Sequence, residues 1–535
     1  MNKETTENII EQYIETAERD EPVWIGEVRE AFNAQEDSRK LTLKLALSDN
    51  TEREFPCHIP VWKTAREKEF CAEYLCAFVY NALSALGGKK REYVFDPAEE
   101  ELRSVIADAE KKLSSPSGGY QRILRETARI SRLTEDCAPA ERKNSGRNVP
   151  LDEILRTAAE KALQGVRAGI DVGGTDIKFA VSVDGHLTDT LEYDWNPGSF
   201  PTAARIIEPI LSLTEKLLRK TGAEAFDGIG LSFPDVVMAD RICGGETPKT
   251  EGIRSNPEAD YETEFGEISA LGQKMKKLCK PDAAVRLAND GSVAAITSAV
   301  ELSFSSEPEL IASGAFSHAL GTSLGTGLVM RDGRIPAIPL EFYDSVIDLG
   351  SLRKRGYDTE DIRSTRSSSG VPGVDRYLGQ ASAFRYAYER NPALLDGFTE
   401  RTETGILRIR TSPADLRKPC LEHLMKEAEN GDPDAEWVFT RIGESFGRIS
   451  REAVTFLSPE PDTRFIFGRF AKYPGAFRCI RNGFEAVLPE VKLIPADDSM
   501  AYSPLMLDLA ARKEITVAQF GQAIGAIYLS GTDAE

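Results

Sequence analysis

Two stretches of this chain place apolar runs on both sides of a short corner that is rich in glycine and threonine. In the first stretch, residues 168–180, the corner is formed by Gly173, Gly174 and Thr175. Apolar runs that flank a Gly-Gly corner predict a β-hairpin, because glycine permits the positive φ angles of a tight turn. The N–H groups of such a turn can approach an anion closely, and Thr175 adds a hydroxyl donor.

Charged residues border this first corner on both sides. Asp171 stands at the end of the first apolar run, and Lys178 lies in the second. Because Mg²⁺ prefers one or two carboxylates together with water, Asp171 is a candidate to hold a hydrated Mg²⁺ against phosphates. Lys178 would bring a cation to the same phosphates. An ordinary Gly-Gly hairpin that binds nothing is the alternative interpretation.

The second stretch, residues 319–330, predicts another hairpin, with Gly321, Thr322, Gly325 and Gly327 at its corner. The glycine spacing is not that of a dinucleotide-binding loop, because a strand and not a helix follows it. The chain also lacks the G-x-x-x-x-G-K-[ST] sequence of a P-loop. Two separate phosphate-binding hairpins suggest a nucleotide held in a cleft between two similar domains.

Four motifs in this order resemble the ROK group of sugar kinases and repressors, within the actin, Hsp70 and hexokinase superfamily. Residues 171–178 are similar to the first phosphate motif of that family, and 321–327 to its second. Residues 288–295 resemble the segment with the catalytic aspartate, and 230–235 the Gly-x-Pro-Gly strand end below the sugar site. The resemblance runs from about residue 167 to the C-terminus. It implies a two-lobed α/β fold of actin/hexokinase (ribonuclease H-like) type, with ATP and Mg²⁺ as cofactors.

Asn289 and Asp290 are the candidate catalytic segment. Phosphoryl transfer to a hydroxyl needs an acceptor for the departing proton, and a carboxylate at a strand-to-helix turn can provide it. The small and apolar run 292–301 predicts a buried helix that starts beside Asp290. Asn289 can donate and accept hydrogen bonds with sugar hydroxyls. A purely structural N-cap role for Asp290 is the alternative.

The chain departs from the family pattern where the sugar is read. Glu341 falls at the place of the sugar-binding glutamate, but Asp344 stands where the family has histidine. The cysteine-rich zinc segment is replaced by residues 367–373, which contain no cysteine, so the sequence predicts no structural zinc. Asp344 therefore puts the identity of the acceptor in doubt.

Two further segments have altered sequences. Residues 246–254 occupy the place of a neutral sugar-contact loop and bring Lys249 to it. Lys249 indicates either an acidic or phosphorylated substrate or an ordinary solvated loop. An apolar run ending at Gly468 is expected below the adenine, although Arg469 replaces the second glycine that is common there. The last helix, 518–529, resembles the closing helix near the nucleotide.

Composition limits the remaining possibilities. The chain has 535 residues, 41% of them hydrophobic, which predicts several globular domains. Eight cysteines without regular spacing indicate reduced thiols and a cytoplasmic location. A net charge of −20 argues against nucleic acid as a partner. No apolar run is long enough to cross a membrane, so no membrane partner is expected.

The N-terminal region, residues 1–165, carries no recognised motif and is expected to be an additional α+β domain. Alternation of apolar residues predicts a hairpin over 41–59, and helical spacing predicts helices over 70–86, 120–133 and 151–163. Its acidic charge is the wrong sign for the DNA-binding winged helix of ROK repressors. Oligomerisation, for instance as a homodimer, a substrate lid and partner docking all remain open roles.

The resemblance implies an ATP-dependent sugar kinase, with Asp290 as general base toward a hydroxyl of a hexose or hexose derivative. Residues 166–288 would form the first lobe and 289–514 the second, and a C-terminal helix at about 515–531 would return to the first. A sugar-sensing regulator without catalysis and a sugar-independent ATPase are the alternatives. The sequence does not name the sugar.

Overall fold

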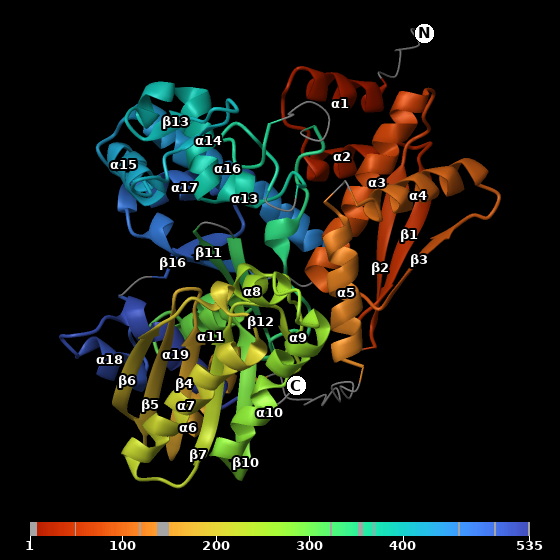
Figure 1. Ribbon diagram of the computed structural model, residues 1–535. Helices are drawn as coiled ribbons and strands as arrows, with labels where there is room; N and C mark the ends of the chain where they lie inside the picture. The colour runs from red at the N-terminus through yellow and green to blue at the C-terminus, as the bar shows by residue number, and fades with distance from the viewer. Residues whose placement is uncertain are drawn as a thin grey trace.

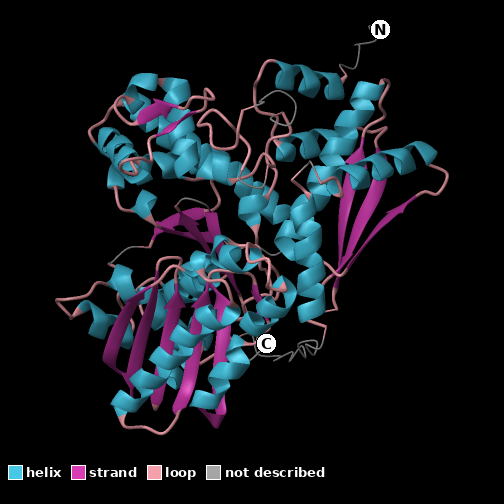
Figure 2. Ribbon diagram, in the orientation of Figure 1, coloured by secondary structure: helices cyan, strands magenta, loops and turns pink. Residues whose placement is uncertain are grey.

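The computed structural model builds the chain around three larger β-sheets, to which the described residues add two sheets of two strands each (Figure 1). In Figure 2 the helices cover these sheets and fill the space between them. None of the described helices combines the length and the apolar character needed to cross a bilayer. The structure describes residues 8–48, 50–116, 119–135, 149–321, 324–350, 357–367, 370–457, 461–496 and 499–532.

The N-terminal region contains an antiparallel sheet in which β1 (Arg39–Ala46) lies between β2 (Glu52–Ile59) and β3 (Lys90–Phe95). The predicted hairpin is confirmed, whereas β3 was not predicted. The long helix α3 (Ala65–Leu86) is buried along most of its length. The other helices of this region are α1 (Ile9–Glu18), α2 (Ile25–Asn33), α4 (Glu100–Leu113) and α5 (Gln121–Leu133).

This region does not stand apart from the rest of the chain. Its core is continuous with that of the helices that follow the second hairpin. The rings of Phe55 and Phe78 lie 5.4 and 5.5 Å from that of Phe456, between centroids. The Asn81 amide donates to the carbonyl of Val346 at 2.8 Å and to the Glu452 carboxylate at 2.9 Å. The N-terminal region therefore has a fixed place beside the second lobe.

A five-stranded sheet, in the order β10-β7-β4-β5-β6, forms the first lobe. Strands β4, β5 and β6 form an antiparallel meander. Strands β7 and β10 run parallel to β4 and extend the sheet on the other side of that strand. This sheet lies in the lower part of Figure 1. The strands are β4 (Val166–Val172), β5 (Asp176–Val183), β6 (His186–Asp194), β7 (Phe226–Phe233) and β10 (Cys279–Asn289).

Short strands and helices complete this lobe. The hairpin strands β8 and β9 follow β7, and the helices pack on the sheet or lie in the connection to β10. Their bounds are α7 (Ala203–Thr221), β8 (Val237–Met238), β9 (Arg241–Ile242), α8 (Glu251–Arg254), α9 (Tyr261–Ser269) and α10 (Leu271–Met275).

The second lobe is built on a four-stranded sheet in the order β12-β11-β15-β16. The hairpin of β11 (Gly314–Leu320) and β12 (Leu324–Met330) is antiparallel, and β15 (Thr463–Phe467) and β16 (Lys492–Pro495) run parallel to β11. The other elements are α13 (Asp375–Leu378), α14 (Gln380–Arg390), β13 (Thr399–Arg401), β14 (Leu407–Ile409), α15 (Arg417–Glu429), α16 (Pro433–Phe456) and α17 (Pro474–Val487).

Helices α11 (Asp290–Ser303) and α19 (Val517–Leu529) pack on each other between the two sheets. Helix α19 also lies on β4 and β7, and α11 lies on β11 and β12. Helix α6 (Leu151–Ala162) packs on this pair and not on the N-terminal sheet. The small helix α18 (Pro504–Ala510) precedes α19. The architecture is the two-lobed α/β fold that the sequence predicts.

Candidate active site

The predicted hairpin over residues 168–180 is confirmed, with a turn that carries no bulky side chain. The Gly173 N–H donates to the carbonyl of Asp176 at 2.8 Å, and the Trp195 indole N–H donates to the Gly173 carbonyl at 3.1 Å. Gly174 and Thr175 are exposed at the tip. A β-carbon on Gly174 would meet only the Lys249 side chain, at 3.8 Å. We call residues 173–175 the first glycine turn.

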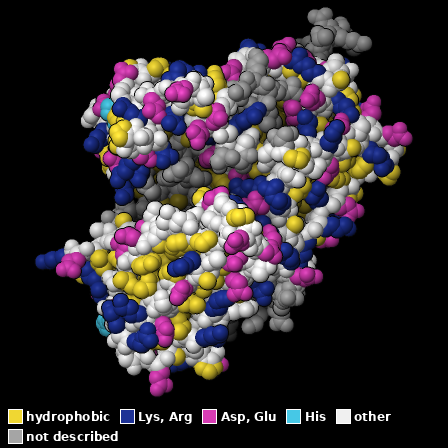
Figure 3. Space-filling model, viewed as in Figure 1, with side chains coloured by type: hydrophobic (Ala, Val, Ile, Leu, Met, Phe, Trp, Pro, Cys, Tyr) yellow, Lys and Arg dark blue, Asp and Glu magenta, His cyan; other side chains and the backbone are white. Residues whose placement is uncertain are grey.

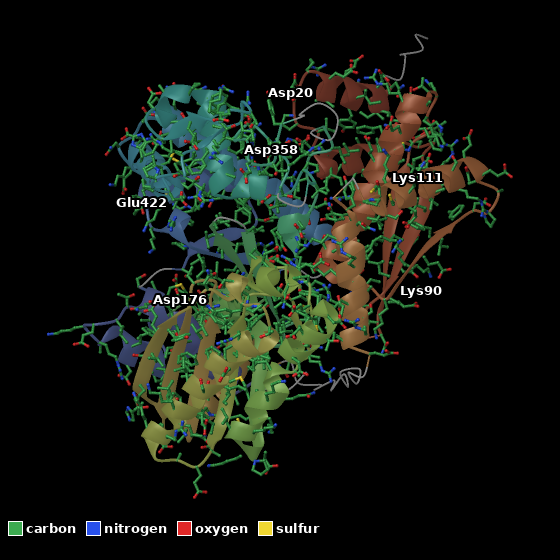
Figure 4. All side chains as sticks on the ribbon, in the orientation of Figure 1. Asp20, Lys90, Lys111, Asp176, Asp358 and Glu422 are labelled. Carbon is green, nitrogen blue, oxygen red and sulfur yellow. The ribbon has the colours of Figure 1, made fainter. Side chains whose placement is uncertain are left out.

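Lys178, expected beside phosphates, is already engaged in ion pairs. Its ammonium group hydrogen-bonds the carboxylate of Asp176 and lies 3.9 Å from that of Glu192. Figure 4 labels Asp176, at the end of the five-stranded sheet that faces the second lobe. Lys178 also lowers the pKa of Asp171, which is its cross-strand neighbour. The positive charge of Lys178 therefore acts electrostatically on the residue just before the turn.

Asp171 lies at the end of β4, where the Ser232 hydroxyl donates to its carboxylate at 2.9 Å. Burial, with a smaller contribution from the nearby Asp290 carboxylate, raises the pKa of Asp171 from 3.8 to about 6. The serine bond and Lys178 oppose this increase only in part. A nearby cation would stabilise the ionised form of this carboxylate, and a hydrated Mg²⁺ is a cation that fits the position.

We expect Asp171→Asn to stabilise the protein above pH 7 when no nucleotide or metal is added. A raised folded-state pKa contributes stability that is complete below about pH 4 and is lost as the pH rises past 6. Asparagine cannot ionise and avoids this loss. The free energy of unfolding of the variant should therefore exceed that of the wild-type protein by on the order of 2 kcal/mol at pH 8. At pH 4 the two proteins should be equally stable.

Urea unfolding at pH 4 and pH 8, in a chelating buffer, measures this difference. Asp194→Asn is a matched control because Asp194 is exposed on β6. It should leave the difference between the two pH values unchanged. A less stable Asp171→Asn at pH 8 would contradict the explanation by burial.

The glycines of the second hairpin, β11–β12, differ in their contacts and exposure. The carbonyl of Gly321 accepts from the N–H of Gln380 at 2.8 Å, and Gly325 is partly exposed. Gly327 lies against the start of α11, because a β-carbon there would be 1.9 Å from the Gly291 carbonyl oxygen. Gly327 therefore allows close packing beside the site. Thr322, also predicted to bind phosphate, lies outside the described residues.

Gly468 follows β15, and the predicted strand before it is confirmed. Its φ is 93°, and a β-carbon there would lie 2.4 Å from the carbonyl oxygen of Leu320. Only glycine combines this backbone conformation with such a close approach. The loop expected below adenine thus lies directly behind the second hairpin.

The predicted helix after residue 291 is α11, and its N-cap is Asn289. The Asn289 side-chain oxygen accepts from the Gly291 N–H at 2.9 Å, and its amide donates to the carbonyl of Asp235 at 2.9 Å. Asn289 therefore performs the capping that was considered for Asp290. Asp290 is the first residue of the helix, and its carboxylate accepts from the same N–H at 2.8 Å.

The carboxylate of Asp290 lies between the two lobes. Burial raises its pKa, while Lys249 and the Gly291 N–H favour its ionised form. Lys249 lies close to both Gly174 and Asp290 and forms no ion pair with the described residues. The space-filling view in Figure 3 shows the surface deeply hollowed between the lobes.

Glu341 and Asp344 lie at the short 3-10 helix Phe342–Asp344, beside the end of α3. The N–H of Glu341 donates to the carbonyl of Ser84 at 2.9 Å. The carboxylate of Asp344 pairs with Arg122 at 3.1 Å, and Arg122 also donates to the Tyr343 hydroxyl at 2.7 Å. Burial raises the pKa of both Glu341 and Asp344.

The sequence predicts no site residue in α5, yet this helix lies beside residues 341–344. Arg122 and Glu126 face residues 341–344, and Arg129 donates to the carbonyl of Gly244 at 2.6 Å. Asp235 was also missed as a site residue, although its loop is held by Asn289. The sequence feature that could have pointed to α5 is the repeat of arginines at three- and four-residue spacing from 122 to 132, which forms one charged helix face.

The structure thus gathers most of the predicted residues around the start of α11. Asp171, Gly174, Lys249 and Asp290 belong to one neighbourhood, and Gly327 touches the same helix start. Residues 341–344 approach this group from the second lobe, since the Thr326 hydroxyl of β12 hydrogen-bonds the carbonyl of Leu340. The second hairpin therefore packs on the helix terminus that carries Asp290, and the first hairpin is linked to the same carboxylate through Lys249 and the charge of Asp171.

Comparison with known proteins gave matches only among solved structures: no family model and no curated protein matches the sequence. The fold is similar to that of a ROK family glucokinase from Streptomyces griseus in complex with glucose and AMPPNP, at 18% identity and a TM-score of 0.38 over 68% of this chain and 98% of that chain. A ROK hexokinase from Thermus thermophilus is also similar, at 16% identity and a TM-score of 0.40 over 64% of this chain and 98% of that chain.

A third similar structure is a ROK family transcriptional regulator, described as a homologue of the E. coli MLC protein. It is 14% identical with a TM-score of 0.40, over 86% of this chain and 99% of that chain. All three are ROK proteins, the group that the four sequence motifs resemble.

Proposed function

We propose that this protein is an ATP-dependent kinase that transfers the γ-phosphoryl group to a hydroxyl of a hexose or hexose derivative. One observation carries the proposal: the Asp290 carboxylate stands at the N-terminus of α11, which packs against the second hairpin, and it acts electrostatically on Asp171 of the first hairpin. Phosphoryl transfer requires anchored phosphates on one side of the acceptor hydroxyl and a proton acceptor on the other. The start of α11 and the two hairpins beside it would provide both.

The residues present fit a nucleotide and a hydrated Mg²⁺. The first glycine turn leaves open space at Gly174, where a phosphate can approach backbone N–H groups. Asp171 is a partly buried carboxylate whose ionised form lacks a full counter-charge, so it would hold Mg²⁺ through water. When bound, Mg-ATP supplies the phosphoryl group and the metal's charge. Gly321, Gly325 and the loop at Gly468 would line the opposite side.

Asp290 would accept the proton of the attacking hydroxyl. Burial raises its pKa, which makes the carboxylate a stronger base, and Lys249 favours its ionised form. The Lys249 ammonium lies near both Gly174 and Asp290, so it would attract oxygens of the transferred group. Asn289 would retain one amide hydrogen for the acceptor. Closure of the lobes would exclude water from the transfer.

ADP release measured with a coupled assay tests this function. We expect release with Mg-ATP to rise at least tenfold when the correct sugar is added to a panel of hexoses, hexosamines and acyl-hexosamines. Release that is rapid but independent of every sugar would instead indicate an ATPase. Absence of release, with sugar binding intact, would indicate a regulator.

The regulator remains a second candidate because of one observation. Arg122 of α5 pairs with Asp344 and hydrogen-bonds Tyr343, and Arg125 pairs with Glu246 in the first lobe. A helix attached to both lobes can report ligand binding to the rest of the N-terminal region. Thermal-shift experiments with sugars, with and without Mg-ATP, detect such binding in the absence of turnover, because a ligand of the folded state raises its melting temperature.

A further inference from the structure

Helix α5 bridges the two lobes at the acceptor end of the site. Toward the first lobe, Arg125 pairs with Glu246 at 2.9 Å, and Arg129 pairs with Glu262 of α9 at 2.9 Å. Figure 1 shows α5 beside α9. Toward the second lobe, Arg122 pairs with Asp344. The helix is thereby fixed in place by ion pairs at both ends.

Glu126 lies on this helix, one turn from Arg122, and is almost fully enclosed. Its side chain is 4% exposed. The carboxylate lies 3.7 Å from the Arg122 guanidinium, which is too long for a hydrogen bond, and its Oε1 atom has no hydrogen-bond partner within the described part of the chain. A buried carboxylate oxygen without a donor is costly, unless a ligand supplies the donor.

Carboxyl groups outnumber cations around Glu126. Burial, together with the Asp344 and Asp235 carboxylates, raises the pKa of Glu126 to about 7, and Arg122 and Arg129 oppose this increase. Glu126 and Asp344 in turn raise the pKa of Glu341. Arg129 is already paired with Glu246 and Glu262, so Arg122 is the main cation for these carboxylates.

This acidic group belongs to the acceptor side of the proposed active site. Glu126 interacts electrostatically with Asp235, whose carbonyl holds the amide of Asn289, the residue before Asp290. The Leu340 carbonyl, just before Glu341, is bonded to the β12 strand of the second hairpin. Residues that interact with Glu126 therefore adjoin both the segment that carries Asp290 and the segment that carries Glu341.

We propose that Glu126, together with Glu341 and Asp344, binds the ammonium group of an amino sugar, so that α5 determines the chemical class of the acceptor. An ammonium group offers three N–H donors and a compact positive charge, which satisfy the unpartnered Oε1 atom and balance the surplus of carboxylates. A hydroxyl offers one donor and no charge. The inference rests on the proposed function in that it assigns the acceptor of that same site.

Calorimetric titration without nucleotide tests the proposal independently of catalysis. The probes are glucose, mannose and galactose, their 2-amino-2-deoxy forms and N-acetylated counterparts, and 3-amino- and 6-amino-deoxyglucose. We expect at least one amino sugar to bind at least tenfold more tightly than both its parent hexose and its N-acetylated form. Parent hexoses that bind as tightly as every amino sugar would overturn the proposal.

The Glu126→Gln variant isolates the contribution of α5. It should weaken binding of the preferred amino sugar at least tenfold and leave binding of its parent hexose within about twofold. Glu135→Gln, which changes an exposed carboxylate just after the same helix, should change neither. An unchanged preference for the amino sugar in Glu126→Gln would contradict the assignment. If that variant does not fold, Asp344→Asn is measured in its place, with the same expected loss.

The outcomes separate this inference from the proposed function. ADP release with a neutral hexose, and no preference for an amine, would uphold the kinase and overturn the role of Glu126. Selective binding of an amino sugar without any ADP release would uphold Glu126 and overturn the kinase.

Discussion

Replacing Asp290 with asparagine is expected to lower the turnover number by about 10²- to 10⁴-fold, the usual contribution of a general base. Asparagine keeps the size of the side chain and an oxygen that can accept from the Gly291 N–H, as Asp290 does now at 2.8 Å. It cannot accept the proton of the acceptor hydroxyl. The phosphate-binding turns are untouched, so ATP affinity should remain within about threefold.

The loss is measured as sugar-dependent ADP release under saturating Mg-ATP, and ATP affinity by thermal shift. Asp282→Asn is the matched control, since Asp282 is an exposed residue of β10, the strand that leads into Asp290. The control should retain wild-type turnover. If Asp290→Asn kept turnover within twofold of wild type, Asp290 would have no part in the chemistry.

The parts of the site that follow a local pattern could be predicted from the sequence. Glycine corners between apolar runs identified both hairpins, because the turn residues are adjacent along the chain. The buried helix after Asp290 was predicted from its small apolar residues. Even here the division of roles was not predictable. Asn289 and Asp290 are both good N-caps, and only the folded chain shows Asn289 as the capping residue.

The contribution of α5 could not be predicted because it depends on contacts between distant residues. Arg122 and Tyr343 are separated by 221 positions, and Arg129 and Glu262 by 133. A charged helix face is usually solvated, so nothing in its pattern distinguishes an interface with the site. The strand β3 was missed for a similar reason, since it is held mainly by pairing with β1.

The junction of the two lobes has no sequence signature beyond scattered small residues. Gly169 of β4 and Gly230 of β7 are direct neighbours in the sheet, and α19 lies on both. A β-carbon on Gly230 would lie 1.7 Å from the Ala526 carbonyl oxygen, and one on Gly169 would lie 1.9 Å from that of Ala523. The glycines allow the helix backbone to rest directly on the sheet.

We therefore expect Gly230→Ala to destabilise the protein by about 3 kcal/mol, the upper part of the range for overpacked cores. The obstacle is backbone, which cannot rotate away as a side chain can, so α19 as a whole must move. Urea unfolding measures the loss. Gly266→Ala provides the control: it adds the same methyl group within helix α9, where a β-carbon would meet nothing within 4 Å. That variant should be slightly stabilised, by up to about 1 kcal/mol, because alanine favours helix over glycine.

Displacement of α19 should also reach the active site. Gln522 of this helix donates a hydrogen bond to the backbone carbonyl of Asp290, so a shift of the helix moves the proposed base. We expect the folded fraction of Gly230→Ala to turn over at least tenfold more slowly than wild type, since small misplacements of catalytic groups are costly. Wild-type turnover per folded molecule, together with lost stability, would mean that α19 supports the fold without positioning Asp290.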